Sequence, residues 1–336
     1  MTTASDSATR HGYLRGLDYG RAFFAVAVVA FHAQALGPFD ALSRPARPDL
    51  AGVIYLNVLL IAVPFFFTTS LFLYARSWRP DLTRFRGRLV QLGLLSAFWI
   101  SLTWSFRGVG QLEAGEAPAF ILSGGDSAFY FFVGLIWLTV TVELMMRRRW
   151  DARPRLLIAL TLASALVMLL EGPLADALPG DRYVVNYWSP LNFIAYAPAA
   201  ILLVRFEAKV LSGRVLVLAL SAYVGLAVVE WMVLDTRDVG PFPVYLPVYS
   251  RPSLVLAAAL IVAVLVRGAW HPPRVVVWLS GLSLGIYCVH QLVLENAAAI
   301  WPALYDKLDV SPFLIFAAVL ATSIALVAAA RSRRLM

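Results

Sequence analysis

Apolar residues occur along this chain in long segments, separated by short polar stretches rich in Arg, Pro and Gly. A helix needs about 20 such residues to cross the roughly 30 Å hydrocarbon core of a bilayer. A window of about 19 residues finds ten segments of suitable length. The sequence therefore predicts an all-α integral membrane protein with about ten transmembrane helices. The predicted spans are residues 19–36, 52–75, 88–105, 128–146, 155–171, 187–204, 214–234, 252–267, 276–297 and 311–330.

The polar stretches between these spans are too short to form a separate soluble domain. We therefore expect one transmembrane domain over residues 1–336, with residues 1–18 as a polar cytoplasmic N-terminus and residues 331–336 as a basic cytoplasmic tail. The first residues lack a short apolar core followed by a small-residue cleavage site, so no removable signal peptide is predicted.

The lysines and arginines predict how the spans are oriented. Most of the 28 basic residues fall in loops on one side of the membrane when the ten spans are counted along the chain. Loops enriched in Lys and Arg face the cytoplasm. Both termini are therefore predicted to be cytoplasmic, in a multi-pass protein of the cytoplasmic (inner) membrane. The basic residues predicted on the opposite side are Arg44, Arg47, Arg107, Arg182, Arg237, Arg251 and Lys307.

Composition supports this class of protein. Hydrophobic residues make up 60% of the chain and charged residues 14%, against about a quarter charged in soluble domains. The net charge of +8 reflects membrane topology, because the basic residues lie at span ends without interleaved aromatic residues for stacking bases. No nucleic-acid partner is predicted. Cys288 is the only cysteine, so no intramolecular disulfide can form, and no ligand spacing predicts a metal site.

The first span carries the clearest candidate chemistry. Arg21 and His32 are eleven positions apart, with only apolar residues between them. At about 100° per residue both side chains lie on one helix face, about 16 Å apart along the axis. This puts Arg21 at the membrane boundary and His32 near the middle of the hydrocarbon layer, where an ionisable group indicates a functional site. An imidazole titrates near neutral pH and suits a general base. A His32 that only bonds a neighbouring helix is the alternative.

Three arginines open the third span in the segment LTRFRGRLV. Guanidinium groups bind phosphate bidentately, so Arg84, Arg86 and Arg88 could form a cytoplasmic phosphate clamp, with Arg21 on the same side. A positive cluster that only sets the topology explains the same residues.

A polar stripe is predicted in the ninth span. Ser283, Tyr287 and His290 lie three or four positions apart in LSGLSLGIYCVHQLV, so they share one helix face. The lining of a polar cavity and hydrogen bonds between neighbouring helices both explain such a stripe. Glu143 and Glu230 lie toward span ends, and the sequence does not rank them.

Three segments resemble the membrane-bound acyltransferase 3 family of bacterial O-acyltransferases. GLDYGRA (16–22) followed by VVAFH (28–32) is similar to the family's opening pattern of a basic residue, ten spacers and a histidine. VPFFFTTSLFLYAR (63–76) is similar to its Pro-x-Phe-Phe-x-x-Ser-Gly segment, with Leu71 in place of the Gly. LSGLSLGIYCVH (279–290) resembles its late Ser-x-x-x-Tyr-x-x-His segment. The segments occur in the expected order, and ten spans is the family's usual core.

The resemblance implies transfer of an acyl group, commonly acetyl, from cytoplasmic acetyl-CoA or another acyl-CoA. The acceptor would be a hydroxyl of an extracytoplasmic glycan, a lipid-linked molecule or a small molecule, and no metal would be required. His32 would be the catalytic residue, as general base or acyl carrier, and Arg21 would help to bind the donor. The family's Arg-x-x-Arg pair has no unique counterpart among Arg84, Arg86 and Arg88. The resemblance also implies a supporting polar lining of Asp18, Ser70, Tyr287 and His290.

A proton-coupled secondary transporter or flippase for a glycan or lipid is the alternative function. Intramembrane His and Glu residues also suit proton relays, and ten spans is an ordinary size for a transporter. The two halves of the chain show no internal repeat, which counts against a transporter. A channel or scaffold leaves the Arg21–His32 register unexplained. Release of free CoA would distinguish an acyltransferase from a transporter.

Overall fold

The protein is all-helical in the computed structural model, and no strand occurs among the residues that the structure describes. These are residues 13–37, 50–107, 117–125, 127–177, 188–206, 212–235, 249–268, 270–301 and 311–332. The predicted polar N-terminus up to residue 12 and the predicted basic tail from residue 333 lie outside them. The helices are α1 (Gly16–His32), α2 (Leu50–Asn57), η3 (Leu59–Ile61), α3 (Ala62–Arg76), α4 (Leu82–Arg107), α5 (Ala117–Leu122), α6 (Tyr130–Arg147), η4 (Trp150–Ala152), α7 (Pro154–Ala177), η5 (Pro190–Phe193), α8 (Tyr196–Phe206), α9 (Gly213–Asp235), α10 (Pro252–Arg267), α11 (Arg274–Glu295), α12 (Ala297–Ile300) and α14 (Pro312–Ser332).

Each of the ten predicted apolar segments coincides with a helix or a short series of helices. Within the described residues, five helical segments are long and apolar enough to cross a membrane by length and composition. The number of spans that cross the bilayer, and their orientation, stay predictions. The five are Gly52–Arg76, Tyr130–Arg147, Gly213–Glu230, Arg274–Glu295 and Pro312–Ser332.

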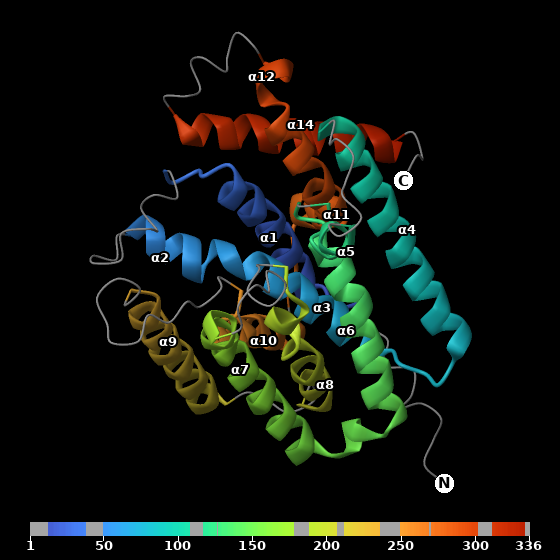
Figure 1. Ribbon diagram of the computed structural model, residues 1–336, viewed down its shortest axis with the longest axis vertical. Coiled ribbons are helices and arrows are strands. Elements are labelled where there is room, and N and C mark those ends of the chain that lie inside the picture. The colour runs from blue at the N-terminus through green and yellow to red at the C-terminus, as the bar shows by residue number, and fades with distance from the viewer. Residues whose placement is uncertain are drawn as a thin grey trace.

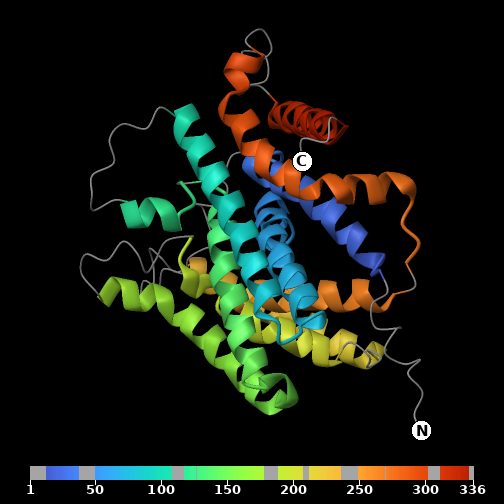
Figure 2. The ribbon, with the colours of Figure 1, turned by 90° about the vertical axis from the view of Figure 1, so that its right-hand side faces the viewer.

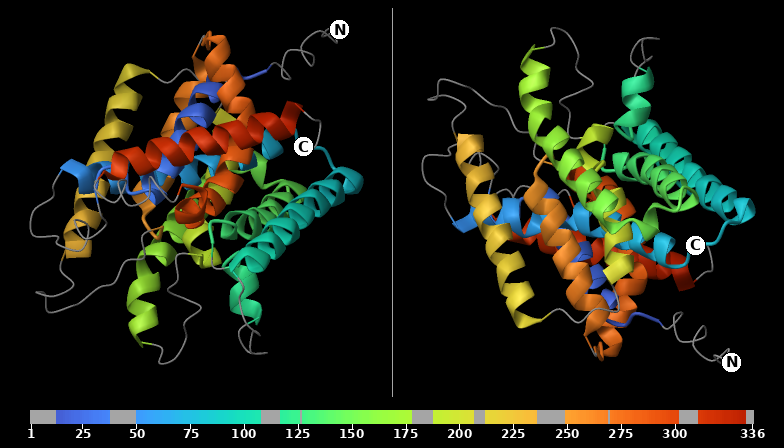
Figure 3. Two further views of the ribbon diagram at one scale, coloured as in Figure 1. Left: turned by 90° about the horizontal axis from the view of Figure 1, so that it is seen from above. Right: turned by 90° about the horizontal axis from the view of Figure 1, so that it is seen from below.

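Four helices, α1, α3, α10 and α11, pack together in the middle of the bundle (Figure 1). Helices α9 and α4 lie at opposite sides of the molecule, and α14 crosses over one end of it (Figures 1 and 3). The outer faces of α4 and α9 expose Val, Leu and Phe side chains along their length. Apolar outer faces around a packed centre are the arrangement expected of helices that contact lipid.

Helices α1 and α11 lie side by side and run in the same direction (Figure 2). Near their starts, the Ser280 hydroxyl of α11 donates to the buried Asp18 carboxylate of α1 at 2.7 Å. Toward their ends, the rings of His32 and His290 lie 5.1 Å apart between centroids. The contact joins the two segments that carry the predicted Arg–His and Ser–Tyr–His patterns.

Two predicted spans end or break earlier than the apolar pattern indicates. Helix α1 ends at His32, whereas the predicted span continues to residue 36. Gln34 takes a left-handed backbone (φ 51°), and the Ala35 amide donates to the Ala30 carbonyl at 3.0 Å. This is a Schellman ending, usually made with glycine. The second predicted span, 52–75, is likewise broken, into α2, η3 and α3. A hydropathy window shows neither the ending nor the break, because Gln34 and Asn57 are single polar residues among apolar ones.

Candidate functional site

The basic helix termini meet at one end of the bundle. Arg267, which ends α10, donates to the carbonyl of Phe206, which ends α8, at 2.5 Å. Arg331 near the end of α14 lies against Gly281 near the start of α11. We call this end, which also contains Arg21, Arg84, Arg88 and Arg147, the arginine end, and the end with His32 and His290 the histidine end.

Arg88 is the arginine most closely built into the helix bundle. Its terminal Nη2 donates to the Ser70 hydroxyl at 2.8 Å, and its Nε donates to the Thr139 hydroxyl at 3.3 Å. The guanidinium carbon lies 4.8 Å from the centre of the Tyr74 ring, a cation–π distance. Its Nη1 has no hydrogen-bond partner in the described part of the chain. The half-buried guanidinium is thus held through Nη2 and Nε, and its Nη1 remains for a ligand.

The other two arginines of this helix differ from Arg88. Arg84, four positions earlier, donates to the carbonyl and, at 2.6 Å, to the hydroxyl of Ser77 in the turn between α3 and α4. Arg86 is exposed and makes no hydrogen bond or ion pair with any described residue. Residues four apart share a helix face and residues two apart do not. The structure therefore groups Arg84 with Arg88 and directs Arg86 elsewhere.

A buried carboxylate stands behind Arg88. Glu143 of α6 accepts from the Tyr74 hydroxyl at 2.6 Å, from the Trp78 indole Nε1 at 2.7 Å and from the Arg147 Nε at 2.7 Å. It therefore fixes the ring beneath the Arg88 guanidinium and adds Arg147 to the same end. The sequence does not rank Glu143, because Tyr74 and Trp78 come from a distant part of the chain and only Arg147 lies on the same helix.

Asp18 and Arg21 lie at the start of α1. The Asp18 carboxylate is buried and accepts from the Tyr13 hydroxyl at 2.8 Å and from Ser280. Asp18 thus joins α1 to α11. Arg21 is half-buried and makes no hydrogen bond or ion pair within the described ranges. Among the described residues Arg88 bonds to Ser70 and Thr139 and not to any partner of Arg21, so the structure brings the two arginines to one end of the bundle without joining them.

The histidine end contains two imidazoles from different helices. His32 is half-buried and packs against His290, which is fully buried. The His290 Nδ1 lies 2.7 Å from the Tyr287 carbonyl and 3.2 Å from the Ile286 carbonyl. Its Nε2 is buried and has no hydrogen-bond partner among the residues described.

Tyr287 and Gln291 attach α11 to the chain just before α6. The Tyr287 hydroxyl donates to the Ala128 carbonyl, and the Ala128 amide donates to the Gln291 side-chain oxygen at 2.8 Å. Through this hydrogen bond Tyr287 fixes α11 against the segment that precedes α6 at the histidine end. Ser283, the first member of the predicted stripe, is also buried.

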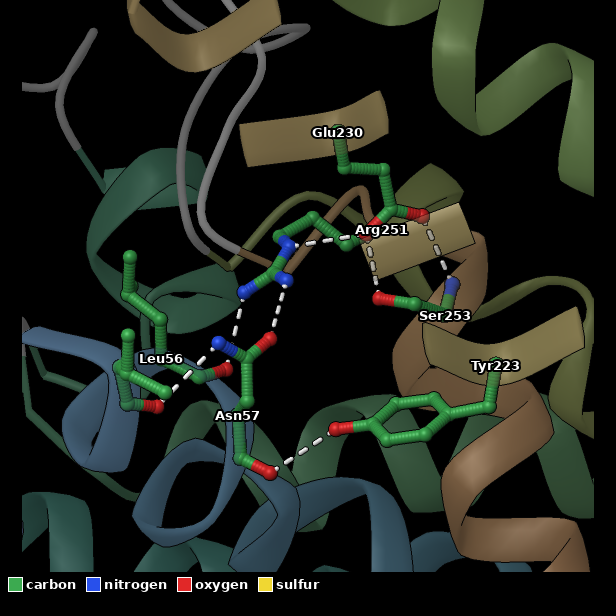
Figure 4. Close-up of polar contacts among 7 residues, drawn as sticks. Leu56, Asn57, Tyr223, Glu230, Arg251 and Ser253 are labelled. Atoms are coloured by element: carbon green, nitrogen blue, oxygen red, sulfur yellow. Dashed lines mark hydrogen bonds and ion pairs between the residues drawn. The ribbon is translucent and has the colours of Figure 1, made fainter. Parts of the chain in front are cut away.

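A second charged cluster near the histidine end was not predicted as a site (Figure 4). Arg251 and Glu230 form a fully buried ion pair at 3.0 Å. Arg251 also donates to the Leu56 carbonyl and to the Asn57 side-chain oxygen, each at 2.8 Å. Glu230 accepts further from the amide and hydroxyl of Ser253.

This cluster explains why the chain can break after α2. The last carbonyls of a helix have no partner within it. At the end of α2 the Leu56 carbonyl is bonded by Arg251, and the Asn57 carbonyl accepts from the Tyr223 hydroxyl of α9 at 3.0 Å (Figure 4). Every Arg251 nitrogen that can donate has a partner, so the network is structural: it attaches the otherwise exposed α9 to the bundle.

No group of three or more His, Cys, Asp or Glu side chains that could hold a metal ion occurs in the ranges that the structure describes. The polar groups that converge are instead guanidiniums at one end and imidazoles at the other. Such a pair of centres can bind an anion at the first and move a proton at the second.

The chain was also compared with known proteins. A family model described as an acyltransferase domain matches residues 14–331, nearly the whole chain. No curated protein and no solved structure gives a significant match.

Proposed function

The chain belongs to the acyltransferase 3 family of membrane acyltransferases, and on that premise we propose that it transfers an acyl group, in our proposal acetyl, from cytoplasmic acyl-CoA to a hydroxyl. The acceptor is an extracytoplasmic glycan, a lipid-linked molecule or a small molecule. The family match agrees with the resemblance seen in the three sequence motifs.

One observation carries the proposal: α1 has a cationic centre at its start and an imidazole centre at its end. The eleven residues from Arg21 to His32 correspond to about 16 Å along a helix axis. An extended molecule with anionic groups at one end and a reactive carbonyl at the other can occupy both centres. Acyl-CoA has that form, with phosphates at one end and a thioester at the other.

The arginine end supports binding of the donor's phosphates. The Arg88 guanidinium is fixed by Ser70 and Thr139 with Nη1 remaining for a ligand. Planar guanidiniums are the side chains best suited to phosphate oxygens. In our proposal Arg88 binds the donor directly, Arg21 and Arg84 add positive charge, and Glu143 holds Tyr74 beneath Arg88.

The histidine end supports the proton transfer. In the proposed step His32 accepts the proton of the acceptor hydroxyl as its oxygen attacks the thioester carbonyl. The tetrahedral intermediate then expels the CoA thiolate, which takes the proton from His32, so the products are an ester and free CoA. A general base positioned in this way contributes about 10²- to 10⁴-fold to a rate.

The proposed orientation places the arginine end in the cytoplasm of a cell with an inner membrane. The helix termini that meet there carry most of the chain's Arg residues, as cytoplasmic loops do. Acyl-CoA would then enter from the side where it is made, and the acceptor would approach His32 from the other side.

Label transfer tests the proposal. Purified protein in detergent is incubated with radiolabelled acetyl-CoA and a crude envelope extract, beside His32→Ala and the matched control His271→Ala. His271 lies outside the helices and is exposed. We expect label in glycan or lipid for the wild type and the control, and none for His32→Ala. No label transfer together with no CoA binding by the wild type would reject the enzyme and favour a transporter.

A further inference from the structure

The hydrogen bonds of His290 determine which of its ring nitrogens carries the hydrogen. Nδ1 faces two backbone carbonyl oxygens, of Tyr287 at 2.7 Å and of Ile286 at 3.2 Å. A carbonyl oxygen can only accept, so Nδ1 must donate. In a neutral imidazole the other nitrogen then carries a lone pair. The structure thus makes Nε2 of His290 a hydrogen-bond acceptor.

That acceptor has no partner among the described residues, although it is buried. Buried polar atoms in proteins are normally bonded, and an exception calls for an explanation. The Tyr287 hydroxyl cannot supply the bond while it donates to Ala128. The ring of His32 lies beside it, with its centroid 5.1 Å from that of His290 and the planes tilted by 47°. A rotation of the His32 ring would turn one of its nitrogens toward the His290 Nε2.

We propose that His290 is the positioning residue for His32, and that its Nε2 accepts a ring N–H from His32 during the reaction. His32 then has one nitrogen engaged with His290 and the other unprotonated and directed to the acceptor hydroxyl. This inference rests on the proposed role of His32 as the base.

The proton balance assigns distinct roles to the two rings. The acceptor O–H proton moves to the free nitrogen of His32 and later to the CoA thiolate. His290 keeps its Nδ1 hydrogen on the α11 carbonyls throughout and stabilises the doubly protonated His32 ring by accepting its other N–H. An orienting group behind a catalytic histidine is a recurring arrangement. Here the orienting group is a neutral ring fixed by its own helix.

Two substitutions separate this role from simple helix packing. His290→Asn keeps an amide N–H near the position of Nδ1, which satisfies the α11 carbonyls, but has no atom at the position of Nε2. His290→Gln places a side-chain oxygen or nitrogen near the position of Nε2. A purely structural His290 would be replaced well by Asn, whereas a positioning His290 would be replaced better by Gln.

Kinetics with acetyl-CoA and the envelope extract compare these variants. We expect His290→Asn to lower kcat at least tenfold with KM for acetyl-CoA unchanged, and His290→Gln to recover part of that loss. Elution from a sizing column and the thermal unfolding midpoint confirm that both variants fold. Activity of a folded His290→Asn equal to wild type would overturn the inference while leaving acyl transfer intact.

A measurement that needs no activity decides the pairing independently. The chain has four histidines, so ¹⁵N-histidine labelling gives few signals, which His32→Ala and His290→Asn assign. We expect His290 protonated at Nδ1, and His32 ring signals that shift in His290→Asn. A His290 protonated at Nε2, or His32 signals that stay unchanged, would overturn the pairing. If the wild type transfers no label, the proposed function fails and this spectrum still tests the contact.

Discussion

Arg88→Lys tests how the arginine end binds the donor. The Arg88 guanidinium uses Nη2 for Ser70 and Nε for Thr139, which leaves Nη1 for a phosphate oxygen. Lysine keeps the charge but has one nitrogen, which cannot reach both hydroxyls and a ligand in the same geometry. The loss is one charge-assisted hydrogen bond, about 1.5–3 kcal/mol. At about 1.4 kcal/mol per factor of ten, KM for acetyl-CoA should rise about 10- to 140-fold.

The assay measures initial rates of CoA release over a range of acetyl-CoA concentrations, with direct titration of CoA binding alongside. Arg86→Lys is the matched control, because Arg86 is two positions away on the same helix and is exposed. We expect kcat of Arg88→Lys to stay near that of the wild type, since the change lies far from His32. An unchanged KM for Arg88→Lys, or an equal rise for Arg86→Lys, would refute the assignment of Arg88 to the donor site.

Two further predictions concern the buried carboxylates. Arg251→Met leaves Glu230 buried without its cation and should destabilise the protein by about 3–5 kcal/mol, which a lower unfolding midpoint in detergent would show. Adding Glu230→Gln should recover part of the lost stability. A double variant no more stable than Arg251→Met would contradict the ion-pair explanation. Glu143→Gln turns an amide N–H₂ toward one of three donors and loosens Tyr74 under Arg88. A loss of about 1 kcal/mol of binding free energy should raise KM for acetyl-CoA about fivefold. A fall confined to kcat would contradict this role of Glu143.

The positions of the helices followed from the sequence because burial in lipid imposes a long apolar run on each one. Helix α4 begins at Leu82, before the predicted span at residue 88, because arginines in its first turns lower the hydropathy there. The early end of α1 did not follow, since it depends on a left-handed Gln34 rather than on a glycine or proline. Nor did the break between α2 and η3, whose free carbonyls are bonded by side chains from distant helices.

The candidate site was predictable where it depends on spacing within one helix. The interval from Arg21 to His32 predicts that both lie on one helix, and α1 contains both. The sequence groups Arg84, Arg86 and Arg88 as one clamp, and only the structure separates Arg86 from the other two. The partners of Arg88 could not be predicted, because they come from α3 and α6.

Arg251 shows the same limit more clearly. The sequence predicts it in a loop on the side opposite the cytoplasm. The structure buries it against Glu230, which comes from the preceding helix. The only signal in the sequence was a carboxylate near the end of an apolar segment.

The central claim is that one extended donor connects the arginine end to the histidine end. A cryo-electron microscopy structure of the protein with a non-hydrolysable thioether analogue of acetyl-CoA tests it most directly. We predict phosphate density against Arg88 and the acetyl carbonyl beside His32. Density for the analogue elsewhere in the bundle, or phosphates at the arginine end with the acyl arm directed away from His32, would contradict it.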